Sequence, residues 1–527
     1  MENSHSRSSG ITEEPQAHSI SIETSQNDIL EARLREAEEN AKNQSQTPKI
    51  QKVIFYLREQ DDFHKNYEPK VVSLGPIHHG KPNYHLGEKY KLRLTNAFIK
   101  GSGKSMQDLY KKIKEKINEL RTCFEEEVTE DYDDEALTSI LLVDGCAILQ
   151  YMYCATKNKF KELNIKTDSV AFGQQDLFLL ENQLPYCLLT LLMSSSVKEK
   201  ELRKSIETYI DWHVNVPEDQ QSNWLSWRHC PRSKPQQAKS EKEDSHDEEQ
   251  PQAQSEKEKS HNEPQQAQSA KEESHDEKKP QAHTISVAQA PEPVHLLDHL
   301  RTRMLHGPKY IPDGTVSKIN QNIQNVQEYW QSYRNVQELK TAGIHLKRGK
   351  NCYLSEIKFT KQFLFRGQLH LPPIVVDDST RPKFLNLIAY ERCLDFENDF
   401  GVTSYISFLD SLIDEANDVK MLRKAQILHN FLGSDEEVAK LFNEIGNDLV
   451  PNIEIYRDVR SQIQKHYRSK WMTWIAQVFH DHFSSPWTFI AFFGVLLALA
   501  LTITQTWYAV NSPPGPCDNF CKNLTPK

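Results

Sequence analysis

The chain has 527 residues, of which 37% are hydrophobic and 26% are charged, and its net charge is −10. This length is enough for two or three domains, and several apolar stretches are long enough to bury a sizeable core. The negative charge disfavours general nucleic-acid binding, because neutralising phosphates requires a basic surface, although a local basic patch is compatible with it. We therefore expect no nucleic-acid partner.

Residues 1–48 are polar and contain no apolar stretch of the kind that a signal peptide needs. Within them, Asp28 to Lys42 is a charged segment with too few apolar residues for a core element, which favours a short solvated helix. We predict that this N-terminal region is largely disordered.

Residues 49–231 form the first part of a predicted helical domain. Turn residues and hydrophobic periodicity indicate four elements in it. They are an extended piece from Pro69 to Gly80, a charged amphipathic helix from Ser105 to Glu126, and two core helices, Ala136 to Ala155 and Gln175 to Met193. Pro185 should kink or divide the last helix, because proline lacks the N–H that a helix interior needs.

Residues 232–290 differ sharply in composition from the parts on either side. Near-copies of one polar unit follow each other there, beginning at Pro235, Pro251 and Pro264. They contain almost nothing apolar, so they cannot offset the entropy lost on ordering, and they lack the face that stacked repeats need. We predict a disordered tandem-repeat insertion, in which the widely spaced histidines favour a solvated repeat over a metal-binding tract.

Residues 291–485 form the second part of the helical domain. Folding resumes at Pro293 to Leu305, and Asn335 to Lys347 reads as a helix ended by Gly343 and followed by a strand. Alternating β-rich runs from Asn351 to Thr380 predict a hairpin or small sheet.

The chain after this sheet reads as helical. Apolar residues at helical spacing predict elements over Phe384 to Leu394, Thr403 to Asp414, Asp418 to Gly433, Ser434 to Gly446 and Ile453 to Phe483. Ser434 followed by Glu437 is a capping-box pattern, in which each side chain pairs an N–H of the first helical turn.

A hydrophobic run without a charge lies near the C-terminus, from Phe489 to Ile503. Pro486 can begin a helix, and aromatic residues flank the run as they do at membrane interfaces. A helix of the 24 residues from Trp487 to Val510 is about 36 Å long, enough to cross a hydrocarbon core of ~30 Å. We predict one transmembrane helix over residues 486–510, rather than a buried core helix, containing Trp487, Phe489, Leu497, Leu499, Trp507 and Val510.

The predicted fold class is therefore mainly α, with a small β hairpin or sheet, a disordered repeat insertion and one C-terminal transmembrane helix in a lipid bilayer. Basic residues are concentrated before the anchor (Arg460, Lys465, Arg468, Lys470) and scarce after it (Lys522, Lys527). This bias places the N-terminal part in the cytosol and the tail, residues 511–527, in the lumen or outside the cell.

The tail contains features that fit an oxidising compartment. Asn523 begins an N-glycosylation pattern, and Cys517 and Cys521 are able to form a disulfide on that side of the membrane. The other seven of the nine cysteines precede the anchor without CxxC spacing, so we expect mostly buried, reduced thiols there. Nothing in the sequence distinguishes the plasma membrane from an endomembrane.

Several motifs occur together and in order, and through them the chain resembles the plant domain-of-unknown-function 247 family, also called UPF0481-like proteins. The matching segments are Val72 to Gly80, Leu141 to Leu149, Asp176 to Leu189, His295 to Arg301, Glu338 to Lys347, Leu369 to Thr380, Phe384 to Glu391, Tyr405 to Ile413 and Phe431 to Asn443, followed by a Trp-rich approach to the membrane helix. The departures are small: Ile77 and Cys187 stand where relatives commonly have an aromatic residue.

The resemblance implies a plant-specific, helix-rich protein anchored at its C-terminus, and no general biochemical activity. Some members are linked to pollen–stigma self-incompatibility in grasses and one to sex determination, which suggests recognition or signalling through a protein partner. We expect such a non-enzymatic interaction module here.

Three groups of residues are candidates for chemistry. GSGKS (Gly101 to Ser105) lacks the earlier glycine of a phosphate-binding loop, because that position is Phe98, and it reads as a turn before a helix. His64, His78, His79 and His85 lie within a short stretch, where a hydrogen-bonded turn is favoured over a zinc site.

The third group consists of polar residues inside apolar segments. Glu181, with Asn182 and Gln183, lies in a segment read as a core helix, and Asp144 lies in another. Buried polar groups must be paired, so structural networks are favoured; the alternative is an enzyme whose acid–base site joins Glu181, Asp144, His78 and Glu391. No GxSxG, HExxH or Cys–His signature is present, and we expect no catalytic residue, metal or cofactor.

Overall fold

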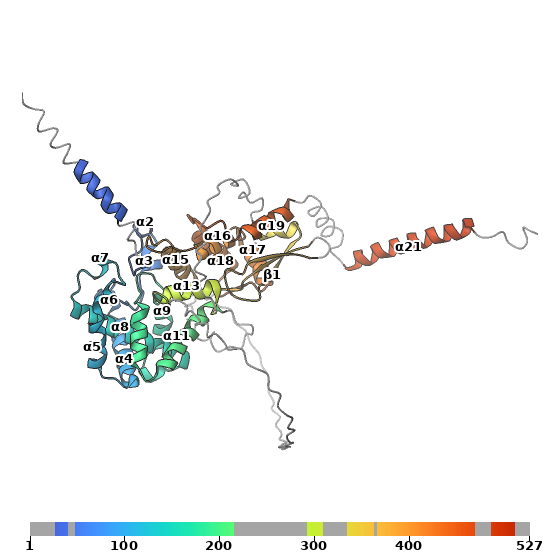
Figure 1. The fold of residues 1–527 in the computed structure, drawn as a ribbon. Coiled ribbons are helices and arrows are strands. Elements are labelled where there is room, and N and C mark those ends of the chain that lie inside the picture. Colours follow the sequence, from blue (N-terminus) through green and yellow to red (C-terminus); the bar gives the residue numbers. More distant parts are fainter. Residues whose placement is uncertain are drawn as a thin grey trace, which may run out of the picture.

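The computed structural model describes residues 27–39, 48–215, 292–308, 335–362, 366–468 and 486–511. These residues confirm the predicted fold class, because they form mostly helices, two small sheets and one apolar C-terminal helix (Figure 1). The predicted repeat insertion and the tail with Cys517, Cys521 and Asn523 lie outside the described residues.

The first part of the domain is helical. Its elements are α2 (Phe55–Arg58), α3 (Phe63–Tyr67), η1 (Pro82–Tyr84), α4 (His85–Ser102), α5 (Met106–Glu115), α6 (Ile117–Arg121), α7 (Glu126–Thr129), α8 (Asp134–Lys157), η2 (Phe160–Leu163), α9 (Thr167–Asp176), α10 (Tyr186–Ser195) and α11 (Glu199–Val214). A short helix also covers residues 27–39, and its Ile29, Leu30 and Leu34 are exposed, as the charged segment predicts.

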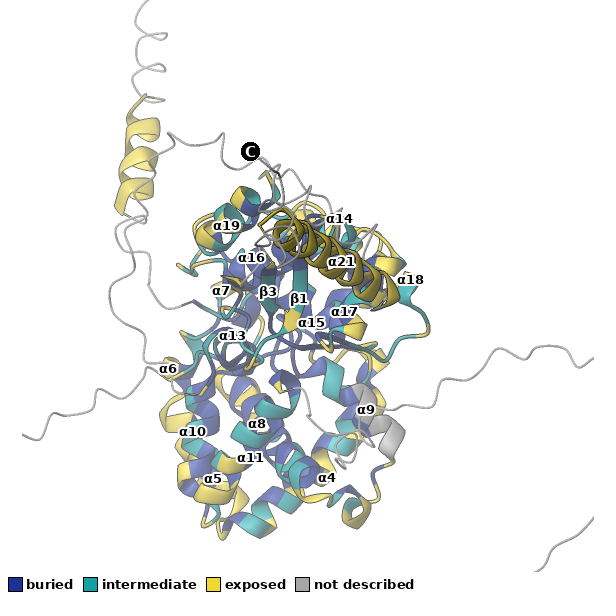
Figure 2. Cartoon of the chain, turned by 90° about the vertical axis from the view of Figure 1, so that its right-hand side faces the viewer, coloured by how far each residue is buried: buried dark blue, intermediate teal, exposed yellow. Residues whose placement is uncertain are grey.

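Helix α8 is the centre of this part, as its apolar sequence predicts. It packs against α4, α5, α10 and α11, and most of its side chains are buried on every face (Figure 2). Gly145 allows α10 to come close, because a Cβ at this position would lie 2.6 Å from Leu192 Cδ1. The apolar sequence of α8 therefore reflects burial in protein.

The helix predicted over Ser105 to Glu126 is wrong in its length. The chain bends at Lys116, where φ is −110° and ψ is 8°, and again after α6, so two shorter helices, α5 and α6, replace one, and α7 begins where the predicted helix ends. GSGKS does form the predicted turn: Gly103 ends α4 with φ of 72°, and Ser105 caps α5 in a capping box with Asp108. Helix α4 was not among the predicted elements.

The second part mixes helices with two sheets. Its elements are α13 (Leu296–His306), α14 (Val336–Thr341), β1 (Ile344–Arg348), β2 (Lys358–Lys361), β3 (Gly367–Leu371), β4 (Ile374–Val376), α15 (Thr380–Glu391), α16 (Gly401–Asp410), α17 (Ala416–Lys424), β5 (Leu428–Asn430), α18 (Asp435–Gly446) and α19 (Arg457–Tyr467). Gly343, with φ of 79°, separates α14 from β1 as predicted.

The small sheet confirms the β-rich prediction. Strand β3 is central and pairs antiparallel with β2 and parallel with β1, and one face of the sheet buries Leu346, Leu369 and Phe359 against the core. The prediction of one helix from Asp418 to Gly433 is wrong. Its second half forms β5, because Ile374 N–H donates to Ile427 O at 2.8 Å and β5 then pairs with β4.

Both parts of the domain share one continuous hydrophobic core. Helix α3 packs against α15, and α11 packs against α13. Helices α11 and α13, which are far apart in the sequence, are therefore neighbours in the fold.

The apolar C-terminal helix α21 (Pro486–Asn511) differs from α8 in its surroundings. Both helices are long and apolar enough to cross a membrane, but 83% of the most apolar window of α8 is buried and none of that of α21 is. Trp487, Leu497, Leu499, Trp507 and Val510 are all exposed. Burial in the domain thus accounts for α8 and not for α21.

Candidate functional site

The residues between α9 and α10 form an irregular buried segment at the junction of the two parts. Glu181, Asn182 and Gln183 are each at most 2% exposed. The expectation that they lie inside a helix is wrong, because Pro185 ends the irregular segment and α10 begins at Tyr186. Their side chains instead bind backbone groups of other segments.

Asn182 and Gln183 use their whole amide groups in this way. Asn182 Oδ1 accepts from Leu74 N at 2.6 Å, and its Nδ2 donates to Val72 O at 3.0 Å and Asp176 O at 2.9 Å. Gln183 Oε1 accepts from Leu297 N at 3.0 Å, which caps α13 from a distant part of the chain. Two amides therefore satisfy backbone groups on both sides of the repeat insertion.

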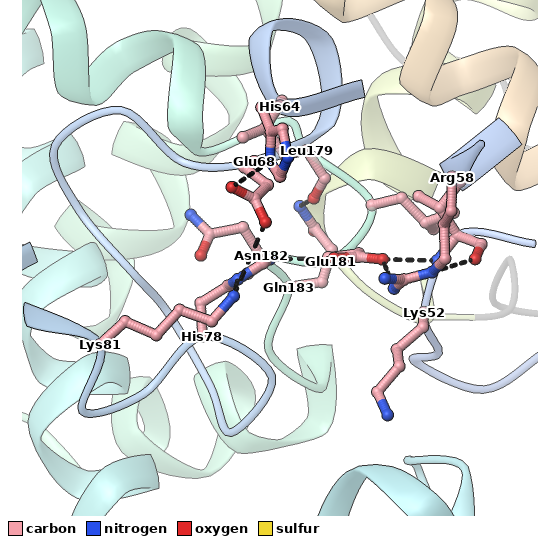
Figure 3. Close-up of polar contacts among 12 residues, drawn as sticks. Lys52, Arg58, His64, Glu68, His78, Lys81, Leu179, Glu181, Asn182 and Gln183 are labelled. Atoms are coloured by element: carbon pink, nitrogen blue, oxygen red, sulfur yellow. Dashed lines mark hydrogen bonds and ion pairs between the residues drawn. The ribbon is translucent and has the colours of Figure 1, made fainter. Parts of the chain in front are cut away.

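Glu181 lies between His78 and Arg58 (Figure 3). Its Oε1 accepts from Val53 N at 2.7 Å and from the Arg58 guanidinium. Its Oε2 lies 3.0 Å from His78 Nε2, an ion-pair distance at which the two groups are not aligned as a hydrogen bond. The structure thus confirms that the acidic side chain reaches other segments.

His78 has a second polar neighbour on the other side of its ring. Lys81 Nζ lies 2.9 Å from His78 Nδ1. An ammonium group has only donors, so it can donate to Nδ1 while Nε2 lies toward Glu181. Lys81, His78 and Glu181 form a chain of polar contacts that ends in the buried carboxylate.

Asp144 binds the same backbone region from the side of α8. Its Oδ2 accepts from Gly75 N at 2.8 Å, and its Oδ1 lies 2.6 Å from Lys91 Nζ. Burial lowers the pKa of Lys91, but the Asp144 and Glu88 carboxylates raise it by more, so the ammonium stays charged at neutral pH. Lys91 also donates to Ser73 O at 2.8 Å.

Asp176, at the end of α9, completes this arrangement. Its two oxygens accept from Lys70 N and Val71 N at 2.8 Å and from Val72 N at 2.9 Å. Burial raises the pKa of this carboxyl to about 6, against the three N–H groups that lower it.

The irregular backbone from Lys70 to His78 is therefore held by side chains from the surrounding helices and from the segment after α9. Such backbone has no helix or strand partners, and an unpaired buried N–H or C=O is costly. Gly75 is required there, because its φ is 70° and a Cβ would lie 2.9 Å from Gln183 O.

Glu391 belongs to a separate network. It accepts from Val402 N at 2.9 Å and Thr403 N at 2.8 Å at the start of α16, and from Arg301 Nε at 2.8 Å. A carboxylate at a helix N-terminus accepts from the free N–H groups and interacts favourably with the positive end of the helix dipole. The structure thus brings His78 and Glu181 together, places Asp144 across the same segment, and leaves Glu391 elsewhere.

The other histidines do not meet at one point. His79 is exposed beside Tyr132, and His85 is exposed at the start of α4. His64 pairs with Glu68 at 2.9 Å, and Glu68 lies 3.7 Å from Lys81, so these two residues link His64 to the contacts of His78 (Figure 3). Among the described residues, no three His, Cys, Asp or Glu side chains are grouped to hold a metal ion.

The polar network offers little access to a substrate. His78 and Glu181 are each 1% exposed. A pocket with about 20 Å³ for water-sized groups lies between α11, α13 and β4, lined by residues such as His213, Met304 and Ile374, and no network residue lines it. This volume holds about one water molecule. The network fixes backbone positions. Among the described residues, the contact between His78 and Glu181 is its only feature that resembles a catalytic acid–base pair.

The sequence motifs that meet in this network are those of a known family. The family model described as "Plant protein of unknown function", DUF247, matches residues 50–501. The chain belongs to the DUF247 family. It is 25% identical over 469 residues to UPF0481 protein At3g47200 of Arabidopsis thaliana, covering 85% of this chain and 83% of that protein.

A second relative shows the same extent of similarity. Putative UPF0481 protein At3g02645 of Arabidopsis thaliana is 22% identical over 494 residues, which is 85% of this chain and 88% of that protein. No solved structure matches the chain. The DUF247 match confirms the family resemblance and, with it, an unassigned biochemical activity.

Some members of the network carry no signal in the sequence of this DUF247 protein. Lys91 lies in α4 among other charged residues, and Arg58 lies in a short charged stretch. Asn386, whose side chain joins Leu180 N to Asn66 O, lies in an ordinary apolar helix. Only long-range packing identifies these residues as partners.

His295 begins α13 next to the same network. Its Nδ1 accepts from Asp298 N at 3.1 Å, its ring lies 4.7 Å from that of Tyr390, and it is fully buried. Burial lowers the pKa of this imidazole to about 4, with Asp298 and Asp395 opposing the shift.

We predict that replacing Glu181 with alanine lowers the free energy of unfolding by about 3 kcal/mol, because it leaves Val53 N–H and Arg58 without their buried partner. Urea unfolding of the full chain in detergent measures this change. The matched control is Glu135→Ala, which removes an exposed partner of Lys114 at 2.9 Å and should cost less than ~1 kcal/mol. Equal losses in the two variants would contradict the structural role of Glu181.

We predict that His295 makes the fold sensitive to mild acid. An unfolded histidine takes up its proton near pH 6.5 and folded His295 near pH 4, so stability is complete above pH ~6.5 and is lost as pH falls toward 4. The loss amounts to at most roughly 3 kcal/mol. His295→Asn keeps a capping acceptor without a titrating group, so its unfolding energy should fall less between pH 7 and 4.5. Parallel curves for the two proteins would refute this assignment.

Proposed function

We propose that this chain is a membrane-anchored, non-enzymatic protein-interaction module that acts in plant recognition or signalling. The observation that carries the proposal is the exposure of α21, an apolar helix of 26 residues with none of its most apolar window buried. A transmembrane helix needs about 20 apolar residues, and this one has no charged side chain.

The buried polar network supports the non-enzymatic part of the proposal. Asp144, Asp176 and Asn182 all bind backbone groups or buried cations, so their binding capacity is used within the fold. A partner would therefore bind to exposed residues on the surface of the domain. The positive-inside bias supports a cytosolic domain with a lumenal or extracellular tail.

The second candidate is an enzyme whose site includes His78, Asp144 and Glu181. The His78–Glu181 contact at 3.0 Å favours it, since a carboxylate beside an imidazole is a common general-base arrangement. It requires an opening to a substrate, which the buried positions of both side chains do not supply.

We predict that Leu497→Arg together with Leu499→Arg removes the chain from membranes. Each arginine at the centre of a transmembrane helix costs about 2.5–3.5 kcal/mol on insertion scales. The measurement is the fraction that stays in the membrane pellet after alkaline extraction. Leu92→Arg, at an exposed position of α4, is the control and should leave that fraction unchanged. Retention of the double variant in the pellet would refute α21 as the anchor.

We predict that affinity purification of the intact chain from plant membranes recovers a specific protein partner. Deleting residues 235–279 should not change this recovery, because the proposal assigns recognition to the folded domain. Loss of the partner on deletion would place recognition in the repeats. Repeated recovery of no partner, with a substrate found for the His78 site instead, would favour the enzyme.

A further inference from the structure

The outer face of the three-stranded sheet is basic. Side chains alternate across a strand, so the residues opposite the buried row lie on one outer face. Lys347, His370 and Lys358 face each other across β1, β3 and β2 in one register row, and His345, Gln368 and Thr360 form the next. Lys347 and Lys358 are exposed.

The charge of this segment is opposite to that of the whole chain. Residues 344–371 contain six cationic residues (Lys347, Arg348, Lys350, Lys358, Lys361 and Arg366) and one carboxylate, Glu356. Among the strand residues, Lys347 and Lys358 lie on the outer face, whereas Arg348 and Lys361 alternate onto the side of Leu346 and Phe359. Glu356 Oε2 lies 3.5 Å from Lys358 Nζ and offsets only one of these charges. The net charge of −10 is therefore carried elsewhere, and this sheet is a local basic patch.

The pKa values of the two histidines on this face, His345 and His370, are both lowered in part by nearby cations. The pKa of His370 is lowered by burial first and then by Lys347 and Lys358. The pKa of His345 is lowered by burial first and then by Arg366, Lys340 and Lys347. The cations therefore lie close enough together to act on common neighbours.

The sheet also lies where the domain continues toward the membrane helix. Helix α19 packs along β2, and the ring of His466 lies 5.8 Å from that of Phe359. Figure 2 views this side of the domain, on which α19, β1 and β3 lie together. The 17 residues between Arg468 and Pro486 span at most roughly 60 Å when fully extended, so the end of α19 lies within this distance of the start of α21.

We propose that the outer face of the β1–β3–β2 sheet docks on the anionic phospholipid headgroups of the membrane in which α21 is anchored. Clusters of lysine and arginine beside a transmembrane helix are attracted to anionic lipid, and the attraction acts within about one Debye length of the surface. The tether keeps the face within reach, and the anionic headgroups complement its charge. This inference rests on the proposed anchoring by α21.

Lysine acetylation footprinting tests the docking on the full chain, reconstituted into phosphatidylcholine vesicles with and without phosphatidylserine. Mass spectrometry should show Lys347 and Lys358 acetylated at least threefold more slowly in the anionic vesicles. One molar salt should remove this protection, because it shortens the Debye length to ~3 Å. Lys111 on α5, which is mostly exposed and far from β1 in Figure 1, is the control and should change less than twofold.

A charge-reversal variant separates docking from anchoring. Lys358→Glu should reduce the protection of Lys347 at least twofold while the chain still floats with the vesicles, because these two lysines lie in the same register row. Flotation of the wild-type chain without protection would overturn the docking and leave the anchor standing. Failure of the wild-type chain to float would overturn the anchor itself. Protection by added RNA in neutral vesicles, without protection by anionic lipid, would also overturn the lipid assignment.

Discussion

Buried backbone that is neither helix nor strand must find hydrogen-bond partners, and this requirement organises the domain. The segment from Lys70 to His78 passes through the interior without a strand beside it, and Asp144, Asp176 and Asn182 supply what a neighbouring strand would otherwise provide. Asp144 comes from α8, whereas Asp176 and Asn182 come from the end of α9 and the segment after it, so they can act only when these elements are packed together. Polar pairing and core packing therefore depend on each other.

This dependence bears on function. A carboxylate that accepts a buried backbone N–H and pairs with a cation cannot change partners without leaving these groups unpaired, which makes it a poor general base. Asp144 does this with Gly75 N and Lys91, and Glu181 does it with Val53 N and Arg58. The family motifs around Asp144 and Glu181 therefore describe how the domain folds. The exposed α21 and the lysines on the outer face of the sheet are groups that the fold does not use.

Local signals predicted what local interactions decide. The apolar run of α8, the Gly343 turn and the Ser434 cap of α18 each follow from neighbouring residues, and all three are present. The sequence failed where a distant partner decides: β5 exists because β4 lies beside it, and Glu181 lies in a loop because His78 and Val53 bind it there. That Glu181 would pair with another segment was predictable from its apolar surroundings, but the identity of that segment was not.

The contacts on either side of the predicted repeat insertion, residues 232–290, bear on how the domain accommodates it. Tyr186 N donates to Val294 O at 2.8 Å and Gln183 holds Leu297 N, while Arg303 pairs with Asp211 at 3.2 Å. The two ends of the insertion are thus fixed beside each other by contacts outside it. Closing a connection between fixed ends costs only about 0.6 kcal/mol more for each doubling of its length. Repeats can therefore be gained or lost there with little change in stability, provided that the polar residues after α9 keep both halves of the domain together.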